Sequence, residues 1–324
     1  MKFNWKIILI AIVIVIVLGV GSAYLFFRRE MNVPNESITA NTLIRIKADE
    51  STDQIGADLM ALGLIKNARL FFWIELLTGG GIKPGYYEIT PRMSLLEIAE
   101  LINSGKTKIV KVTFPEGYRV EQIGQKLNSA GIVSYANFMA AAKKDEGKLF
   151  PDTYFFDPLM TADEVIAKML EDYTTRTAGM NVTDKDLILA SIVEKEAAND
   201  TDRGIIAGIY QNRINSKMKL QSDPTIAYGR DSGAITGLTV AEIADYVFWK
   251  SAKTAEFTSV KSTYNTYLIA SLPPAPICNP GLASIKAALN PSPSNYYYFL
   301  YGSDGKIHPA RTQAEHSANV AKYL

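Results

Sequence analysis

The longest apolar run in the sequence covers residues 7–27, which read IILIAIVIVIVLGVGSAYLFF without a charged side chain. As an α-helix, a run of this length crosses the roughly 30 Å hydrocarbon core of a bilayer. A cleaved signal peptide is the alternative, because Gly21-Ser22-Ala23 resembles a small-residue cleavage site, but the run continues through Phe27. The pattern predicts an uncleaved transmembrane helix at 7–27, preceded by residues 1–6 and followed by a polar linker at 28–41.

Beyond the linker, a strand pattern is followed by a helix pattern that recurs. Residues 42–46 alternate as in a strand, and the helical stretch 53–59 (DQIGADL) ends at Gly63. A similar stretch, EQIGQKL, starts 68 residues later at 121 and ends at Gly131, and a weaker copy (96–102, LEIAELI) lies between them. We interpret 42–135 as a duplicated strand and helix unit, although helices that end at glycine also resemble one another by chance.

From about residue 111 the pattern changes to an irregular mixture of strands and helices. Helices are predicted at 163–173 and 183–198, and a strand at 296–301. Their order is too irregular for a doubly wound parallel sheet, so the predicted class is α+β. The expected layout is a transmembrane helix, a small βααβ module at 42–110 and a mixed α+β domain at 111–324.

The helix predicted from Thr183 carries the clearest candidate for chemistry. Thr183 and Asp186 have the spacing of a capping box. At about 100° per residue, apolar side chains within 188–193 form one stripe, and Glu196 falls near its centre. Glu194 points about 160° away from that stripe. Of the two glutamates, only Glu196 is therefore expected at the core or at a cleft wall.

A carboxyl group in that position would be desolvated. Desolvation disfavours the carboxylate and raises the pKa toward the range that suits a general acid. A buried glutamate that is paired with arginine or held by backbone amides is the alternative for Glu196. Glu194 and Lys195 are expected on a solvated helix face.

Composition narrows the chemistry further. The 34 basic and 33 acidic side chains give a net charge of +1, which argues against a nucleic-acid partner. Cys278 is the only cysteine, so intramolecular disulfides and C-x-x-C sites are excluded. His308 and His316 are the only histidines, which argues against a multi-histidine metal site. We expect no metal and no organic cofactor.

Several short motifs in the second half occur in a characteristic order. They are FPDTY (150–154), ASIVEKE (190–196), LQSDPT (220–225), YNTY (264–267), LPP (272–274) and NPG (279–281). This ordered series resembles that of the YceG-like endolytic murein transglycosylases. The small βααβ module resembles LysM-like modules, which bind glycans that contain N-acetylglucosamine. Together with the apolar N-terminal run, the resemblance covers nearly the whole chain.

The resemblance implies a reaction. In that family the second glutamate of the E-K-E triplet is catalytic, which is Glu196 here. It implies cleavage of the β-1,4 bond between N-acetylmuramic acid and N-acetylglucosamine in nascent strands, which ends strand elongation. The muramic acid's own 6-hydroxyl attacks and leaves a 1,6-anhydro end. One carboxyl group can serve such a reaction as acid and then as base, whereas hydrolases use two carboxylates. Asp223 and Asp152 remain candidates for a second carboxylate.

Polar side chains in and near these motifs are candidates for substrate contacts, with turn formation or core packing as the alternative for each. They are Asn212, Gln221, Asp223, Thr225, Tyr264, Asn265, Thr266 and His308. Ala310 stands where the family usually has an aromatic residue, which weakens any role for the C-terminal loop.

The resemblance also implies a location and partners. It places residues 1–6 in the cytoplasm, a single span in the bacterial inner (plasma) membrane, and the catalytic domain outside the cytoplasm. Peptidoglycan glycan strands are the expected substrate, and peptidoglycan synthases of the elongation or division machinery are the expected partners. Two other functions stay open: a muramidase that uses water, and a non-catalytic glycan-binding scaffold of the cell-wall synthesis machinery.

Overall fold

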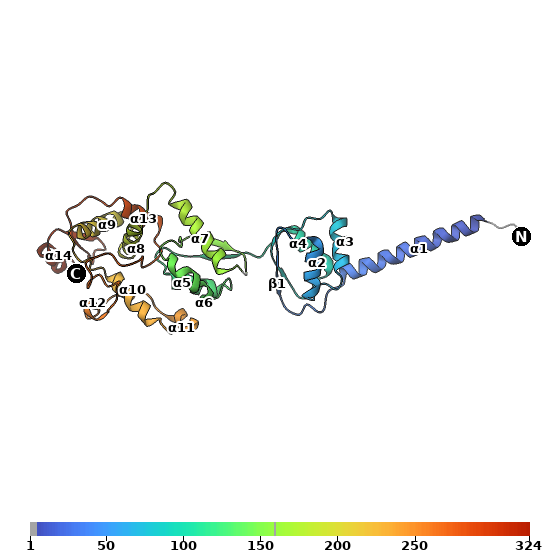
Figure 1. Ribbon diagram of the computed structural model, residues 1–324, viewed down its shortest axis with the longest axis horizontal. Helices are drawn as coiled ribbons and strands as arrows, with labels where there is room; N and C mark the ends of the chain where they lie inside the picture. Colours follow the sequence, from blue (N-terminus) through green and yellow to red (C-terminus); the bar gives the residue numbers. More distant parts are fainter. Residues whose placement is uncertain (1–4, 159) are drawn as a thin grey trace. The chain divides into compact units, whose positions relative to one another are not determined.

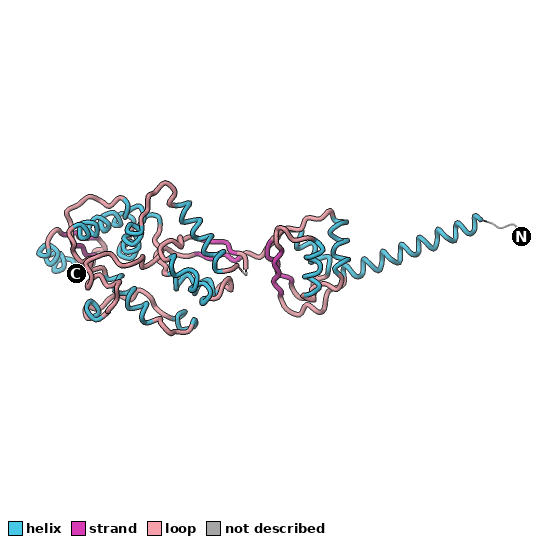
Figure 2. The backbone as a smooth tube through the Cα atoms, in the orientation of Figure 1, coloured by secondary structure: helices cyan, strands magenta, loops and turns pink. Residues whose placement is uncertain are grey.

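The structure, a computed structural model, describes residues 5–158 and 160–324. It divides into two compact units, of which the first ends at Ile109 and the second begins at Val110. Both units mix helices with short antiparallel strand pairs, which confirms the α+β class (Figure 2). Residues 1–4 of the predicted N-terminal segment 1–6 lie outside the described residues.

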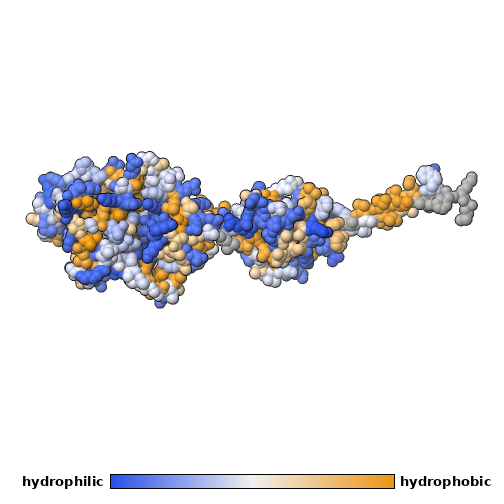
Figure 3. All heavy atoms as spheres, in the orientation of Figure 1, coloured by the Kyte–Doolittle hydropathy of each residue, from blue (hydrophilic) through white to orange (hydrophobic). Residues whose placement is uncertain are grey.

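Helix α1 (Trp5–Asn32) contains the apolar run. Within the described residues it is the one helix long and apolar enough to cross a membrane, over Leu9–Asn32. Hydrophobic side chains cover it in Figure 3. The predicted linker at 28–41 is helical as far as Asn32, and Ile38 belongs to the core of the first unit.

The rest of the first unit is a βααβα arrangement that we name the first copy (residues 42–104). Its elements are β1 (Thr42–Ile46), α2 (Thr52–Ala61), α3 (Ala68–Thr78), β2 (Gly85–Ile89) and α4 (Leu95–Ser104). Strands β1 and β2 pair antiparallel, with Ile44 opposite Tyr87. The helices enclose one hydrophobic core against this pair (Figure 1).

The second unit begins with the same arrangement, which we name the second copy (residues 110–176). Its elements are β3 (Val110–Thr113), α5 (Val120–Ser129), α6 (Tyr135–Ala142), the 3-10 turn η1 (Lys143–Asp145), β4 (Thr153–Phe156) and α7 (Ala162–Arg176). Strands β3 and β4 also pair antiparallel, and this copy has its own hydrophobic core.

The two copies correspond element by element. Strand β3 and helix α5 each begin 68 residues after β1 and α2, and α6 and α7 each begin 67 residues after α3 and α4. An added Cβ on Gly56 would meet the ring of Phe71, and one on Gly124 would meet the ring of Phe138, so both pairs of helices pack alike. The predicted duplication is thus present in the fold, but it extends to Arg176 rather than ending at residue 135. The weaker sequence copy at 96–102 is not a third repeat, because it forms α4, the last helix of the first copy.

The remaining residues form a mainly helical region around a third core. Its elements are α8 (Asp184–Glu196), α9 (Asp200–Asn215), α10 (Asp223–Ala234), α11 (Val240–Asp245), α12 (Glu256–Ser259), α13 (Leu282–Leu289), β5 (Tyr298–Tyr301), β6 (Ile307–Ala310) and α14 (Gln313–Tyr323). Helix α8 packs against α9, α10 and α13, and α14 packs on the β5–β6 hairpin (Figure 1).

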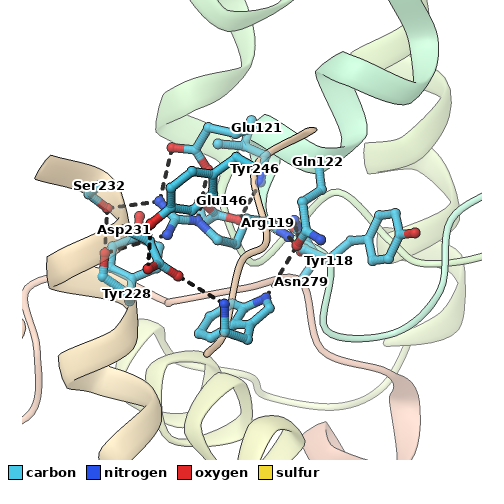
Figure 4. Close-up of polar contacts among 12 residues, drawn as sticks. Tyr118, Arg119, Glu121, Gln122, Glu146, Tyr228, Asp231, Ser232, Tyr246 and Asn279 are labelled. Atoms are coloured by element: carbon cyan, nitrogen blue, oxygen red, sulfur yellow. Dashed lines mark hydrogen bonds and ion pairs between the residues drawn. The ribbon is translucent and has the colours of Figure 1, made fainter. Parts of the chain in front are cut away.

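A buried polar cluster joins the second copy to this region (Figure 4). Arg119 has no exposed surface and forms a two-pronged ion pair with Glu121, at 2.9 and 3.1 Å. Its guanidinium also donates to Ser232 and lies 4.1 Å from the ring centre of Tyr228. Contacts of this kind, made by a planar, permanently charged group, fix α10 against the second copy.

Candidate active site

Glu196 is the last residue of α8, and its place follows from the packing of that helix. Thr183 and Asp186 form the predicted capping box at the start. Every residue from 187 to 193 is buried. Helix α8 is therefore enclosed on all sides in its middle, which is more burial than the single apolar stripe predicts.

Two hydroxyl groups donate to the same oxygen of Glu196. The Tyr210 hydroxyl from α9 and the Ser222 hydroxyl, next to the start of α10, each lie 2.6 Å from Oε1. Ser222 is the N-cap residue of α10, yet its side chain makes no capping hydrogen bond to that helix. Both donors engage Oε1, which leaves Oε2 as the oxygen that can carry a proton.

The surroundings raise the pKa of Glu196. Burial is the largest cause and the nearby charge of Asp223 acts in the same direction, while the two hydroxyl donors and Arg213 lower the pKa. A negative charge is also disfavoured at the C-terminal end of a helix, where Glu196 lies. The protonated form therefore persists to higher pH than in a free glutamate, as a general acid requires.

A pocket of about 390 Å³ lies beside Glu196, within the size range of small-ligand sites. Five aromatic rings form much of its wall: Tyr210, Tyr267, Tyr298, Phe299 and Tyr301. Polar lining comes from Arg213, Gln221, Asp223, Gln313 and His316. Tyrosine offers an apolar ring face with a polar end, so this lining suits a ligand that has both apolar faces and hydroxyl groups.

Two of the predicted contact residues line this pocket. Gln221 has a left-handed backbone (φ 53°), and its side-chain oxygen accepts a hydrogen bond from Arg213 at 3.0 Å. Asp223 accepts a hydrogen bond from the Tyr267 hydroxyl at 2.7 Å. Such a backbone conformation in a non-glycine residue costs energy and persists where surrounding contacts hold it.

Three predicted residues lie inside the protein, with no exposed surface: Thr225, Asn265 and Thr266. The hydroxyls of Thr225 and Thr266 are 2.8 Å apart, and Thr266 Oγ1 accepts from the Ser222 amide at 3.0 Å. The Asn265 amide donates to backbone carbonyls of the segment that precedes it. Together these contacts hold the backbone of Ser222, one of the two donors to Glu196.

Asn212 and Tyr264 also make contacts within the protein. The Asn212 side chain donates to the carbonyls of Ser294 and Tyr296, both at 2.9 Å, and so ties the strand that follows to α9. The Tyr264 ring packs 4.5 Å from that of Tyr228. Neither residue lines the pocket beside Glu196.

The two histidines differ in their surroundings. His308 lies 3.1 Å from Asp304 and stacks on Tyr323, and it does not line the pocket. His316 does line it, stacked on Tyr298, and its buried Nδ1 makes no hydrogen bond with the protein. Burial lowers the pKa of His316, with the Arg213 charge acting in the same direction. The surroundings of His316 therefore favour its neutral form, and its Nδ1 has no hydrogen-bond partner in the protein.

The expectation of a solvated face for Glu194 and Lys195 is wrong. Glu194 accepts hydrogen bonds from Arg203, the Gly281 amide and Ser284 at 2.8–3.0 Å. Lys195 lies 4.4 Å from the ring centre of Trp249, and burial lowers its pKa. All four partners lie outside α8, so the periodicity of this helix gave no sign of them.

Sequence reasoning missed Tyr210, Ser222 and Arg213 as site residues. Ser222 stands inside the LQSDPT motif, between two residues that were chosen. Tyr210 and Arg213 lie three residues apart on α9, the spacing of neighbours on one helix face, and Asn212 was chosen from the same turn. Helix spacing around Asn212 gave no signal for either residue, because residues one or two apart on a helix do not face each other.

Metal ligation has no support in the part of the chain that the structure describes. Over 5–158 and 160–324, no group of three or more His, Cys, Asp or Glu side chains is arranged to hold a metal ion.

The fold and pocket define a protein whose site is centred on one half-buried carboxyl group beside an aromatic wall. The chain belongs to the YceG-like family, whose model matches residues 44–322.

Relatives and a solved structure agree with this membership. The endolytic murein transglycosylase of Bacillus subtilis is 28% identical over 94% of this chain and 91% of its own length. The protein of the same name from Streptococcus pneumoniae D39 is 27% identical over 87% of this chain, which matches 58% of that longer protein. A crystal structure of a YceG-like protein from Listeria monocytogenes superposes with a TM-score of 0.54, at 28% identity over 86% of this chain and 98% of that one.

Proposed function

We propose that this chain is an endolytic murein transglycosylase, a lyase that cuts peptidoglycan glycan strands with Glu196 as its acid and base. The observation that carries the proposal is the Glu196 carboxyl group, with a raised pKa and two hydroxyl donors on one oxygen, beside an aromatic-walled pocket. The name shared by the relatives supplies the substrate class.

The steps balance with one carboxyl group. Protonated Glu196 gives its proton to the bridging oxygen as the bond from the muramic acid C1 breaks. The resulting carboxylate then accepts the proton of the 6-hydroxyl as that oxygen bonds to C1 and forms the 1,6-anhydro ring. Glu196 ends protonated again, and no water is consumed. The Tyr210 and Ser222 hydroxyls stabilise the transient carboxylate through Oε1.

The proposed substrate contacts divide into two groups. Gln221, Asp223 and the aromatic wall would touch the sugars, because they line the pocket. The remaining predicted residues would act by holding loops around it: Asn212, Thr225, Tyr264, Asn265, Thr266 and His308. Their hydrogen bonds and ring contacts within the protein support this second role.

The first copy and α1 would hold the enzyme near its substrate. We propose that residues 42–110 are a LysM-like glycan-binding module and that residues 111–324 form the catalytic domain. We further propose that α1 is a retained membrane anchor, with the rest of the chain outside the cytoplasm beside peptidoglycan synthases. The strand and helix order of the first copy and the length of α1 support these assignments.

The decisive experiment is mass analysis of the ends that the full-length enzyme produces from glycan strands. Glu196→Gln keeps the volume but cannot transfer a proton, so we expect a loss of about 10²-fold to 10⁴-fold. Asp223→Asn should retain the anhydro product if Asp223 only supports the substrate. Products heavier by one water, or an active Glu196→Gln enzyme, would contradict the mechanism.

The pH profile tests the roles of the two hydroxyls. Activity should fall as pH rises through the raised pKa of Glu196. Tyr210→Phe and Ser222→Ala each remove a donor that lowers this pKa, so the alkaline limb should move to higher pH. Lower activity with an unmoved limb would leave these residues with a purely structural role.

A further inference from the structure

Helix α3 of the first copy presents an apolar face to solvent. Trp73, Leu76 and Leu77 are 52%, 59% and 80% exposed. At about 100° per residue they lie, with Arg69, within an arc of roughly 100°. We name these four side chains the outer face of α3. The opposite side of the helix, including Phe71 and Ile74, is buried in the core, so the core leaves the outer face largely in solvent.

The second copy supplies an internal comparison. Helix α6 occupies the place of α3, offset by 67 residues, and Phe138 is buried as Phe71 is. The positions that match Trp73, Leu76 and Leu77 are Ala140, Lys143 and Lys144, all exposed. The βααβα fold therefore does not require an apolar outer face, and the first copy carries one for another reason.

The first copy is attached directly to the candidate membrane helix. Met31 of α1 packs against the core of this copy, and α1 contacts α4. Arg29 and Glu30 line a pocket together with Lys66 and Asn67, which immediately precede α3. The apolar run ends at Phe27, and at 1.5 Å per residue Arg29 is only about 3 Å further along the helix. The start of α3 therefore adjoins the end of the membrane-spanning segment (Figure 1).

The charges around the outer face fit a phospholipid surface. Arg28 and Arg29 follow the apolar run, Lys66 precedes α3, and Arg69 lies in its first turn. Glu30 is the acid beside them in the same pocket, and Glu75, the acid on α3 itself, is buried on the other side of the helix. Tryptophan and basic residues are enriched where helices meet the lipid headgroups, and a helix with an apolar face and a basic flank lies in that interface.

We propose that the outer face of α3 docks on the outer surface of the bilayer that α1 spans, with Trp73, Leu76 and Leu77 inserted among the headgroups. The docking rests on the proposed membrane anchoring but not on the proposed catalysis. It turns a single-helix anchor into a two-point attachment, which fixes the orientation of the first copy relative to the membrane.

Fluorescence quenching by brominated lipids tests this docking on the full chain. A Trp5→Phe variant is reconstituted in bilayers of phosphatidylcholine and phosphatidylglycerol. A second variant also carries Trp73→Phe. The difference between the emission of the two variants is the signal of Trp73. We expect a roughly twofold drop in Trp73 emission with bromine near the headgroup end of the acyl chain, and a weaker drop with bromine near the methyl end, because interfacial helices insert only about 5–10 Å.

The matched control is Ala140→Trp in the background that lacks Trp73. It places a tryptophan at the same site of the second copy, where no quenching is expected. Equal quenching at both sites, or none at Trp73, would overturn the proposal. If the Trp73 signal changed only with protein concentration, the outer face of α3 would bind another molecule of this protein. That result would also overturn the docking proposal.

Two further variants test the charge contribution and the membrane anchoring separately. Arg69→Glu should weaken Trp73 quenching more in bilayers with phosphatidylglycerol than in phosphatidylcholine alone, and an unchanged signal would contradict the charge argument. Val13→Trp, in the middle of α1, should be quenched by deep bromine. If it is not, the anchoring proposal has failed. If it is and Trp73 is not, the docking proposal alone has failed.

Discussion

The loop between the first strand and helix lies in solvent in the first copy, whereas the end of the corresponding loop is buried in the second copy. Ser51 ends this loop in the first copy, is exposed, and accepts a hydrogen bond from the Gln54 amide as an ordinary helix cap. The residue in the same place of the second copy is Arg119, which is fully buried. Tyr118 beside it pairs with the backbone of Asn279 in the site-bearing region.

The difference shows how one backbone arrangement serves two environments. The core contacts are kept, as the Gly56–Phe71 and Gly124–Phe138 pairs show. The residues outside the core differ: the first copy has an exposed apolar face on α3, and the second copy has a loop that ends in the buried, charged Arg119. The repeat in the sequence therefore identifies the shared core, while the substitutions between the copies identify what each one touches.

The largest expected contrast lies in that loop. Arg119→Ala leaves the Glu121 carboxylate buried without its ion-pair partner, which should cost about 3–5 kcal/mol of the unfolding free energy. Ser51→Ala removes only a cap and should cost about 1 kcal/mol. Hydrogen exchange of peptides from each unit reports the two costs separately. Equal costs would mean that the second copy does not depend on its buried loop.

The second contrast is in pH dependence. Burial and the charge of Glu121 raise the pKa of Glu146 from 4.5 to about 8, against the charge of Arg119 and the donated hydrogen bond from the Val120 amide. A raised pKa in the folded state means stability that is full below the unfolded pKa and is lost as pH rises through the folded one. The second unit should therefore lose stability between pH 4.5 and about 8.

Glu75 of the first copy gives the matched case. Burial raises its pKa too, opposed by a hydrogen bond from Asn103. Glu146→Gln should flatten the pH dependence of the second unit and leave the first unit as it was, and Glu75→Gln should have a smaller effect confined to the first. Thermal unfolding and hydrogen exchange across this range measure both. An unchanged slope in Glu146→Gln would show that this carboxyl group is already ionised.

Local sequence signals predicted the elements well, and long-range contacts were beyond them. The strand at 42–46 and the capping box at Thr183 form as predicted, because alternation and cap spacing depend only on neighbouring residues. Glu196 was selected by helix periodicity and does line a pocket. Glu194 was misplaced on the same reasoning, because its partner Arg203 belongs to another helix.

The C-terminal region shows the same limit. His308 was predicted as a substrate contact and His316 was not, but His316 is the histidine that lines the pocket beside Glu196. Thr225 and Thr266 have the residue type of substrate contacts but lie inside, bonded to each other across 41 residues of sequence. A residue's type indicates what it can bind, and only the fold determines what it meets.

The capping boxes of α4 and α7 should contribute equally to the stability of the two copies. Ser94 in α4 and Thr161 in α7 form the same capping box, with Glu97 and Glu164 as the reciprocal partners. In both, the backbone amide at the cap lies 2.8 Å from the glutamate. Ser94→Ala and Thr161→Ala should each cost about 1 kcal/mol. Hydrogen exchange of the two helices measures these losses of unfolding free energy. Losses that differ severalfold would show that the caps of α4 and α7 are not equivalent.

The smallest expected contrast is at the paired glycines. In a helix interior, alanine is more stabilising than glycine by about 1 kcal/mol. A glycine-to-alanine change therefore destabilises the protein only if its steric conflict costs more than this. At Gly56 the new Cβ would lie 3.2 Å from the Ala68 carbonyl oxygen and 3.4 Å from Phe71, so Gly56→Ala should be close to neutral. At Gly124 it would lie 2.9 Å from Phe138, and that ring is fully buried and cannot turn aside. Overpacking of a core costs about 1–3 kcal/mol, so Gly124→Ala should destabilise the second unit by up to about 2 kcal/mol net. Chemical denaturation monitored by hydrogen exchange in each unit measures the pair, and a Gly124→Ala protein at least as stable as the original would mean that the second copy packs its helices more loosely than the first.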